Sequence, residues 1–152
     1  MNATRKRFST EHIHEFRQPC SDVFKLACPV REDEWLPGWR ELREIIYTES
    51  GFAELGCVFK TKSMPHLMGP ATWVVNIFIP PERIQYSAVN EKLVDQIEWV
   101  LEPAGKGCKV ALKRRWTALN TKAEEFLGKM GEQTDRKPPD LFGLIERYFE
   151  IK

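Results

Sequence analysis

The sequence lacks the long apolar segments and the excess of one charge that mark several large classes of protein. No apolar run approaches the roughly 18 residues that a membrane-spanning helix needs. The first ten residues lack the apolar core of a signal peptide. The net charge is +1, so no overall field favours nucleic acid or an anionic membrane. We therefore expect a cytoplasmic protein that neither binds nucleic acid nor inserts into a membrane.

Motifs of common catalytic and metal sites are also missing. The four cysteines form no CxxC pair, and we expect them to be small buried side chains in a reducing compartment, without a disulfide framework. No nucleophile elbow, phosphate-binding loop or dinucleotide fingerprint is present. His12 and His14 face the same way on a strand, as zinc ligands can, with His66 or a cysteine as a third ligand. Because no carboxylate or cysteine is in register with them, we expect no metal and no cofactor.

The composition that remains is that of an ordinary globular protein. The chain has 152 residues, of which 42% are hydrophobic and 30% are charged. A chain of this length can bury about 70% of the surface that it exposes when unfolded. We therefore predict a single domain over residues 1–152.

The segment 23–39, VFKLACPVREDEWLPGW, holds the clearest local signals. Its apolar opening, 23–27, predicts a short helix that ends before a Cys-Pro pair. The acidic stretch 31–36 predicts a second helical turn. Trp35 and Trp39 then flank a Pro-Gly bend, so an aromatic plug precedes the rest of the chain.

Seven segments read as β-strands because their apolar and polar residues alternate or because they are rich in β-branched and aromatic residues. Most of the connections between them are short, which indicates antiparallel hairpins, since a parallel pair needs a crossover of a dozen residues or more. The predicted strands are residues 8–16, 41–50, 53–62, 71–79, 83–90, 94–102 and 108–119.

The last third of the chain changes to a helical period. A polar helix is predicted over 121–129, then a linker over 131–139, and Asp140 is expected to cap a helix over 141–151. The apolar stripe of this last helix needs an apolar surface to cover, and the concave side of the sheet is the large candidate.

This order of elements resembles the START-like superfamily, also called SRPBCC, which includes polyketide cyclase/dehydrase-like and birch-pollen-allergen-like proteins. The resemblance covers nearly the whole chain, and its PVRE-x-x-W-x-x-GW string is similar to bacterial members of undefined role. It implies an α+β helix-grip fold, with a curved seven-stranded antiparallel sheet wrapped around a long C-terminal helix and two short helices between strands 1 and 2. The carrying residues are 23–24, 28–32, 35, 38–39, 56–59, 73–75 and 114–119.

Alternation along the strands places several polar and aromatic side chains on the concave face. Arg114 and Trp116 share one face of the last strand, and Trp99 is expected to point inward from the strand before it. His12 and His14 point inward from the first strand, which lies beside the last one in the resembled fold. A buried arginine needs an anion, and a nearby histidine can move a proton, so these residues could form a ligand site.

An alternative explains the same residues without a ligand. Arg114 would pair with an internal carboxylate, such as Glu32 or Asp95, and the histidines would bond backbone or water. The five tryptophans could line a cavity or form plain core, and the acidic run 32–34 is expected to be an exposed helix face. The residues predicted to line the cavity are His12, His14, Trp35, Trp39, Asn76, Tyr86, Trp99, Arg114 and Trp116.

Three functions follow from the resemblance. The first is binding or carriage of a small hydrophobic or amphipathic molecule between the sheet and the C-terminal helix. The second is a polyketide cyclase or dehydratase type of enzyme, in which Arg114 holds a carboxylate or enolate and His12 or His14 moves the proton. The third is a co-chaperone-like interaction module. The sequence does not decide between a monomer and a homodimer. The glycine-rich loop of the plant members is absent, which argues against a plant-type hormone binder.

Overall fold

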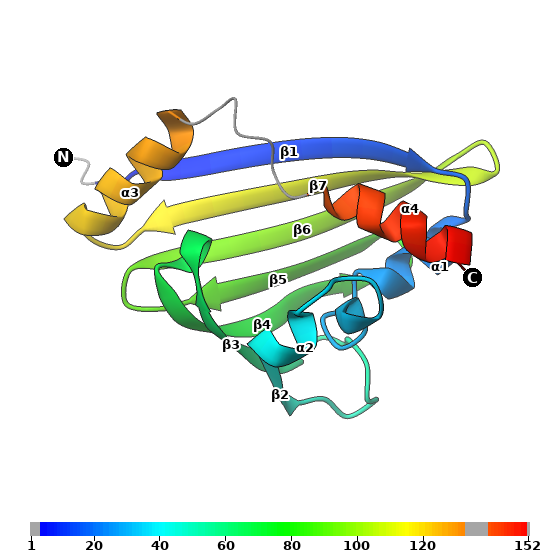
Figure 1. Ribbon diagram of the computed structural model, residues 1–152, viewed down its shortest axis with the longest axis horizontal. Helices are drawn as coiled ribbons and strands as arrows, with labels where there is room; N and C mark the ends of the chain where they lie inside the picture. The colour runs from blue at the N-terminus through cyan, green and yellow to red at the C-terminus, as the bar shows by residue number, and fades with distance from the viewer. Residues whose placement is uncertain (1–3, 133–139, 152) are drawn as a thin grey trace.

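The chain forms one seven-stranded antiparallel sheet (Figure 1). The computed structural model describes residues 4–132 and 140–151. The strand order is β1-β7-β6-β5-β4-β3-β2, so the first strand pairs with the last and β2 forms the opposite edge. The strands are β1 (Arg7–Phe16), β2 (Arg43–Tyr47), β3 (Val58–Met64), β4 (Gly69–Ile79), β5 (Arg83–Val89), β6 (Leu93–Ala104) and β7 (Gly107–Ala118).

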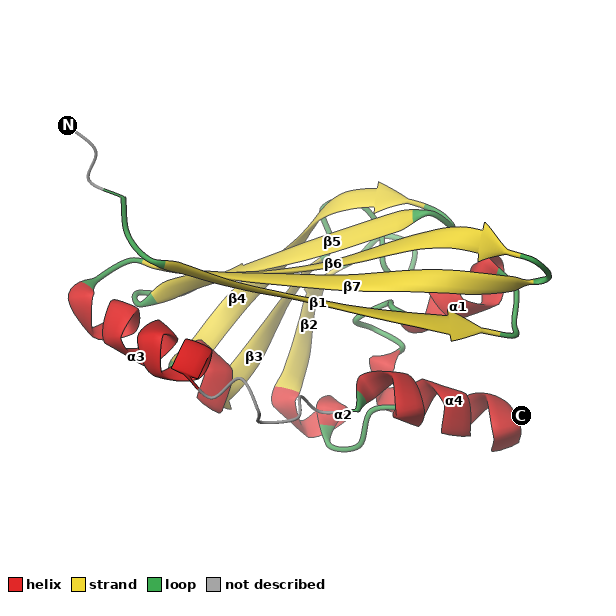
Figure 2. Ribbon diagram, turned by 90° about the horizontal axis from the view of Figure 1, so that it is seen from above, coloured by secondary structure: helices red, strands yellow, loops and turns green. Residues whose placement is uncertain are grey.

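The helices lie on one face of the curved sheet, which we call the inner face (Figure 2). Helix α3 packs on β1 and β7 at one end of the sheet, and α4 lies toward the other end, where its Phe142 contacts the rings of His14 and Phe16. The helices are α1 (Cys20–Leu26), η1 (Glu32–Glu34), α2 (Trp39–Leu42), η2 (Pro65–Leu67), α3 (Thr121–Glu132) and α4 (Leu141–Ile151).

The predicted α+β helix-grip architecture is confirmed, including the two short helical segments after β1. Two strand starts are wrong. The segment predicted over 41–50 begins inside α2, and the segment predicted over 53–62 becomes a strand at Val58 only. The chain turns before Val58, where Gly56 adopts a left-handed φ of 86° and donates its N–H to the Val75 carbonyl.

The C-terminal part also follows the sequence prediction. Asp140 caps α4 as expected, because its Oδ1 accepts a hydrogen bond from the Gly143 N–H at 2.9 Å. The linker predicted over 131–139 begins later, since α3 continues to Glu132, and residues 133–139 lie outside the described residues. No helix in the described part of the chain is long and apolar enough to cross a membrane.

The core lies between the inner face and the helices. The inward residues of β6 and β7, such as Leu93, Trp99 and Val110, are buried, as alternation predicts. All four cysteines are free thiols, and three of them, Cys28, Cys57 and Cys108, are buried. This packing leaves a small number of polar side chains on the inner face, and these define the candidate site.

Candidate functional site

Two polar groups lie on the inner face among aromatic side chains. The first, which we call the Arg114 cluster, consists of Arg114, Asp95 and Trp116. The second, the Glu32 cluster, consists of Glu32, Tyr86 and Trp99. Strands β5, β6 and β7 supply five of these six residues, because alternation turns them toward the helices, and η1 supplies Glu32.

The Arg114 cluster is built on a buried ion pair. Arg114 donates from Nη2 to Asp95 Oδ2 at 2.7 Å, and the Asp95 side chain is fully buried, whereas that of Arg114 is 20% exposed. The guanidinium lies 4.7 Å from the centre of the Trp116 ring, a cation–π contact. The Nε of Arg114 is buried and has no hydrogen-bond partner among the described residues. The internal pairing of Arg114 with Asp95 is therefore present, yet it leaves one donor of the guanidinium unused.

Strand β1 places further polar side chains next to Arg114. Thr10 lies opposite Arg114 and His12 opposite Leu112 in the antiparallel register, and both side chains are half-buried. His14 is in a different environment: its Nε2 lies 3.1 Å from Glu146 Oε1 on α4, and its ring stacks on Phe142. The two histidines therefore do not act as one group with Arg114, and His14 helps to hold α4 on the sheet.

The Glu32 cluster corrects the prediction that residues 32–34 form an exposed face. Glu32 is 5% exposed. Its Oε1 accepts a hydrogen bond from the Tyr86 hydroxyl at 2.7 Å, and that hydroxyl oxygen accepts one from Trp99 Nε1 at 3.0 Å. Because an indole N–H can only donate, the Tyr86 proton must point to Glu32. The three side chains thus form a hydrogen-bond chain with a fixed direction.

Burial has the largest effect on the pKa values of Glu32 and Tyr86 in this hydrogen-bond network. Desolvation raises the pKa of Glu32 to about 7, opposed by the Tyr86 hydrogen bond and by the positive charges of Arg114 and Arg43. The pKa of Tyr86 is raised well above its ordinary value by burial and by the neighbouring Glu32. Burial, with a smaller contribution from Arg114, lowers the pKa of His66 to about 4, so His66 is neutral at physiological pH.

The predicted aromatic residues have distinct roles. The indole N–H groups of Trp35 and Trp39 donate to the carbonyls of Leu26 and Pro29, each at 2.8 Å, and both rings are buried. They therefore fasten the segment before β2 to the core. Phe59 and Trp73 surround Tyr86, with ring centroids 6.1 and 5.9 Å away.

One predicted cavity residue lies on the wrong side of the sheet. Asn76 is exposed on the outer face, where it donates to Gln85 at 2.9 Å and accepts from Ser87. Asn76 alternates with the buried Trp73 and Val75 and so points outward, next to a shift of the β4–β5 register between Val75 and Ile77. It belongs to a polar network that is separate from both clusters.

Two expectations for Glu32 followed from the sequence, an exposed helix face or an internal partner of Arg114; it is buried, and its partner is Tyr86. Three carboxylates, Glu32, Asp33 and Glu34, lie between Val30 and Trp35, so no local signal distinguishes Glu32 from its neighbours. Tyr86 was predicted only as a polar contact in the middle of a strand; in the structure it shares a strand face with Ile84 and Ala88, which are fully buried. The hydrogen bond between Tyr86 and Glu32 could not be predicted, because the two residues lie 54 positions apart in the sequence.

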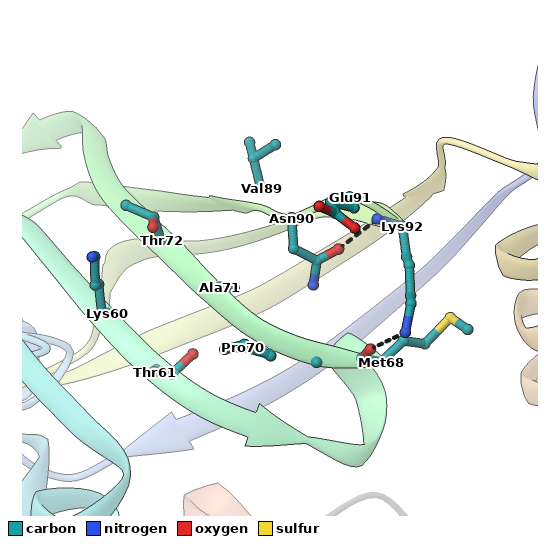
Figure 3. A pocket seen from close by; sticks show the side chains of 11 residues that line it. Lys60, Thr61, Met68, Pro70, Ala71, Thr72, Val89, Asn90, Glu91 and Lys92 are labelled. Carbon is teal, nitrogen blue, oxygen red and sulfur yellow. Dashed lines mark hydrogen bonds between the residues drawn. The ribbon is translucent and has the colours of Figure 1, made fainter.

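A hollow of about 550 Å³ opens elsewhere, at the ends of β3, β4 and β5 (Figure 3). Its polar groups serve the turn that closes β5 and β6. Asn90 Oδ1 accepts from the Lys92 N–H, and Lys92 Nζ donates to the Met68 carbonyl at 2.9 Å. Lys60 and Thr72 at its border are exposed residues of the outer face. This hollow is therefore distinct from the inner-face clusters.

Comparison with known proteins rests on structure alone, since no protein-family model and no curated protein sequence matches the chain. Norcoclaurine synthase from Thalictrum flavum, in complex with dopamine and hydroxybenzaldehyde, superimposes with a TM-score of 0.66 at 11% identity, covering 95% of this chain and 85% of that one. Ara h 8.0201 gives a TM-score of 0.63 at 16% identity, over 97% of this chain and 100% of the other. The chain has the helix-grip fold. CalU16 from Micromonospora echinospora shares this helix-grip architecture, with a TM-score of 0.57 at 15% identity over 97% of this chain and 86% of that one.

Proposed function

We propose that the chain binds a small apolar or amphipathic molecule against the inner face of the helix-grip sheet. The observation that carries the proposal is the position of Arg114, which is partly exposed, lies over the Trp116 ring and has a buried Nε without a partner among the described residues. Buried polar groups are nearly always hydrogen-bonded, so an unused donor beside an apolar surface points to an absent acceptor. The bound dopamine and hydroxybenzaldehyde of norcoclaurine synthase support small aromatic molecules as occupants of this fold.

The surroundings of Arg114 define the kind of ligand. Asp95 neutralises the charge of Arg114 but occupies one edge of the guanidinium only. Thr10 and His12 add polar side chains on one side, and the half-buried Ile97 adds an apolar surface on the other. A molecule with an apolar body and one oxyanion or strong hydrogen-bond acceptor fits this combination.

Two dyes that differ in one charged group test the proposal. The probes are 1-anilinonaphthalene-8-sulfonate and its uncharged analogue N-phenyl-1-naphthylamine. We expect the wild type to bind both dyes, and Arg114→Met to weaken binding of the sulfonate by roughly 10- to 100-fold while binding of the neutral dye is retained. Fluorescence titration measures both affinities.

The matched control is Arg115→Met, which removes the same charge from the adjacent position, whose side chain points to the outer face. It should leave the affinity for both dyes unchanged. The proposal fails if the folded wild type binds neither dye. The assignment to Arg114 fails if Arg114→Met and Arg115→Met weaken sulfonate binding equally.

A further inference from the structure

Glu32 differs from an ordinary buried carboxylate because the groups around it leave it able to gain and lose a proton. Tyr86 engages Oε1 through one hydrogen bond, whose direction Trp99 sets. No arginine or lysine forms an ion pair with Glu32 among the described residues. A carboxylate that is desolvated but held in place by a single neutral donor is the arrangement expected of a proton acceptor.

The charged and titratable groups that face Glu32 come from four parts of the chain. Tyr86 on β5 donates to it, Arg43 on β2 and Arg114 on β7 favour its charged form, and Cys28 lies in the turn before η1. Arg43 is held elsewhere, with Nη2 donating to the Val30 carbonyl at 3.0 Å and lying 3.5 Å from Asp33. Arg114 is held by Asp95. Both cations therefore act on Glu32 through space only, and the carboxyl can be neutral or charged near neutral pH.

The histidines are less suited to moving a proton at the inner face. The His14 ring lies within hydrogen-bond distance of Glu146 and stacks on Phe142, so it is already engaged in contacts with α4. The pKa of His66 lies near 4, which makes it a weak base and leaves no proton to donate at pH 7. The assignment of the proton-moving group to His14 is therefore weaker than an assignment to Glu32.

We propose that Glu32 is a general base for a small molecule bound on the inner face, with Tyr86 as its positioning residue. The inference rests on the proposed binding function and adds a catalytic one. The Glu32 carboxylate would take a proton from an activated C–H or O–H group of the ligand. The electron pair left behind would be held as an enolate-like or phenolate-like anion, which the unused Nε of Arg114 can stabilise. No oxidant, reductant or metal is needed for this step.

The elimination of 5-nitrobenzisoxazole tests the proposal without knowledge of the natural ligand. In this reaction a base takes the ring C–H proton, its electron pair forms the nitrile, and the N–O bond breaks to release a coloured phenolate. We expect the wild type to accelerate the elimination, with a rate that rises through a midpoint near pH 7 as Glu32 ionises. Glu32→Gln should lower kcat/KM about 100-fold.

Tyr86→Phe separates a catalytic role of Glu32 from a structural one. Removing the hydroxyl removes a hydrogen bond that lowers the pKa of Glu32, so the midpoint of the rate profile should move to higher pH. Glu34→Gln, which neutralises the exposed carboxylate two residues away, is the control and should leave rate and midpoint unchanged.

Binding of N-phenyl-1-naphthylamine to each variant distinguishes the two proposals. If wild type and Glu32→Gln bind the dye equally and their kcat/KM values are the same, the catalytic role is wrong and the binding function stands. If the wild type binds no dye, the binding function is wrong. An unchanged midpoint in Tyr86→Phe also contradicts the role given to the pair.

Discussion

Asp95 and Glu32 are two buried carboxylates on the same inner face, and their partners differ. Asp95 forms an ion pair with Arg114 at 2.7 Å, whereas Glu32 accepts a hydrogen bond from a neutral phenol, also at 2.7 Å. Burial raises the pKa of both groups. For Asp95 the guanidinium in direct contact opposes that effect, while the cations that act on Glu32 are held by other groups.

The comparison shows that burial alone does not decide the charge of a carboxylate. A counter-ion in direct contact stabilises the charged form, and a single neutral donor does so less. Asp95 and Arg114 thus form a fixed charged pair, and Glu32 is a group whose charge can change near pH 7. A fixed ion pair of the sheet and a carboxyl of η1 whose charge can change thus lie on the same inner face.

The largest effect is expected when the charged pair is broken. Asp95→Asn leaves the half-buried guanidinium of Arg114 without a counter-ion, and we expect a loss of about 4 kcal/mol in the free energy of unfolding. Urea denaturation followed by circular dichroism measures it. The double variant Asp95→Leu/Arg114→Met removes both charges and should recover most of the loss. A decrease below about 1 kcal/mol in Asp95→Asn would show that the pair is not desolvated.

The second largest effect is the change of stability with pH that is expected from Glu32. The pKa of Glu32 is about 7 in the folded protein and 4.5 as the ordinary value, so ionisation is easier in the unfolded chain. The stability contributed by protonated Glu32 is therefore complete below pH 4.5 and is lost as the pH rises to about 7. A shift of one pKa unit corresponds to about 1.4 kcal/mol. The free energy of unfolding of Glu32→Gln, relative to that of the wild type, should therefore rise by about 3 kcal/mol as the pH increases across this range.

Urea midpoints of both proteins between pH 4 and pH 8 give this difference. Glu34→Gln serves as the control because Glu34 is exposed and its pKa is lowered by Arg31. A difference between wild type and Glu32→Gln that does not change with pH would contradict the shifted pKa.

A smaller loss of stability is expected when the Tyr86 hydroxyl, which donates a hydrogen bond to Glu32, is removed. Tyr86→Phe leaves the Trp99 N–H and the Glu32 Oε1 without their partners, both in a buried site. Each unsatisfied group costs at least about 1 kcal/mol, so we expect a loss of about 2 kcal/mol at neutral pH in urea denaturation. The loss should be smaller at pH 5, where Glu32 is protonated. Equal losses at both pH values would mean that the hydroxyl does not act through the charge of Glu32.

Much of the fold could be predicted because it depends on local periodicity. Alternation in β6 and β7 assigned Trp99, Arg114 and Trp116 to the inner face, and the register of these strands confirms it. The starts of β2 and β3 could not be predicted in this way. The residues before them are as apolar as strand residues, but a short helix and a left-handed glycine at position 56 turn the chain.

The candidate site could be predicted only in part, since hydrogen-bond partners come from distant parts of the chain. The facing of Arg114 followed from alternation, Tyr86 was predicted only as a polar residue in mid-strand, and Asp95 was one of two carboxylates considered for Arg114. The burial of Glu32 depends on how η1 packs onto the sheet, which no local pattern encodes. Asn76 lies on the outer face with Thr72 and Val74, and its facing could not be predicted because both faces of this strand are largely apolar.

A site-specific titration of Glu32 tests the central claim most directly. Protein labelled with ¹³C at the glutamate side-chain carboxyl is titrated by NMR, and the Glu32 resonance is assigned from its absence in Glu32→Gln. We predict a midpoint near pH 7, well separated from those of the exposed glutamates. A midpoint near 4.5 would show that Glu32 is an ordinary charged carboxylate and would contradict both its difference from Asp95 and its role as a base.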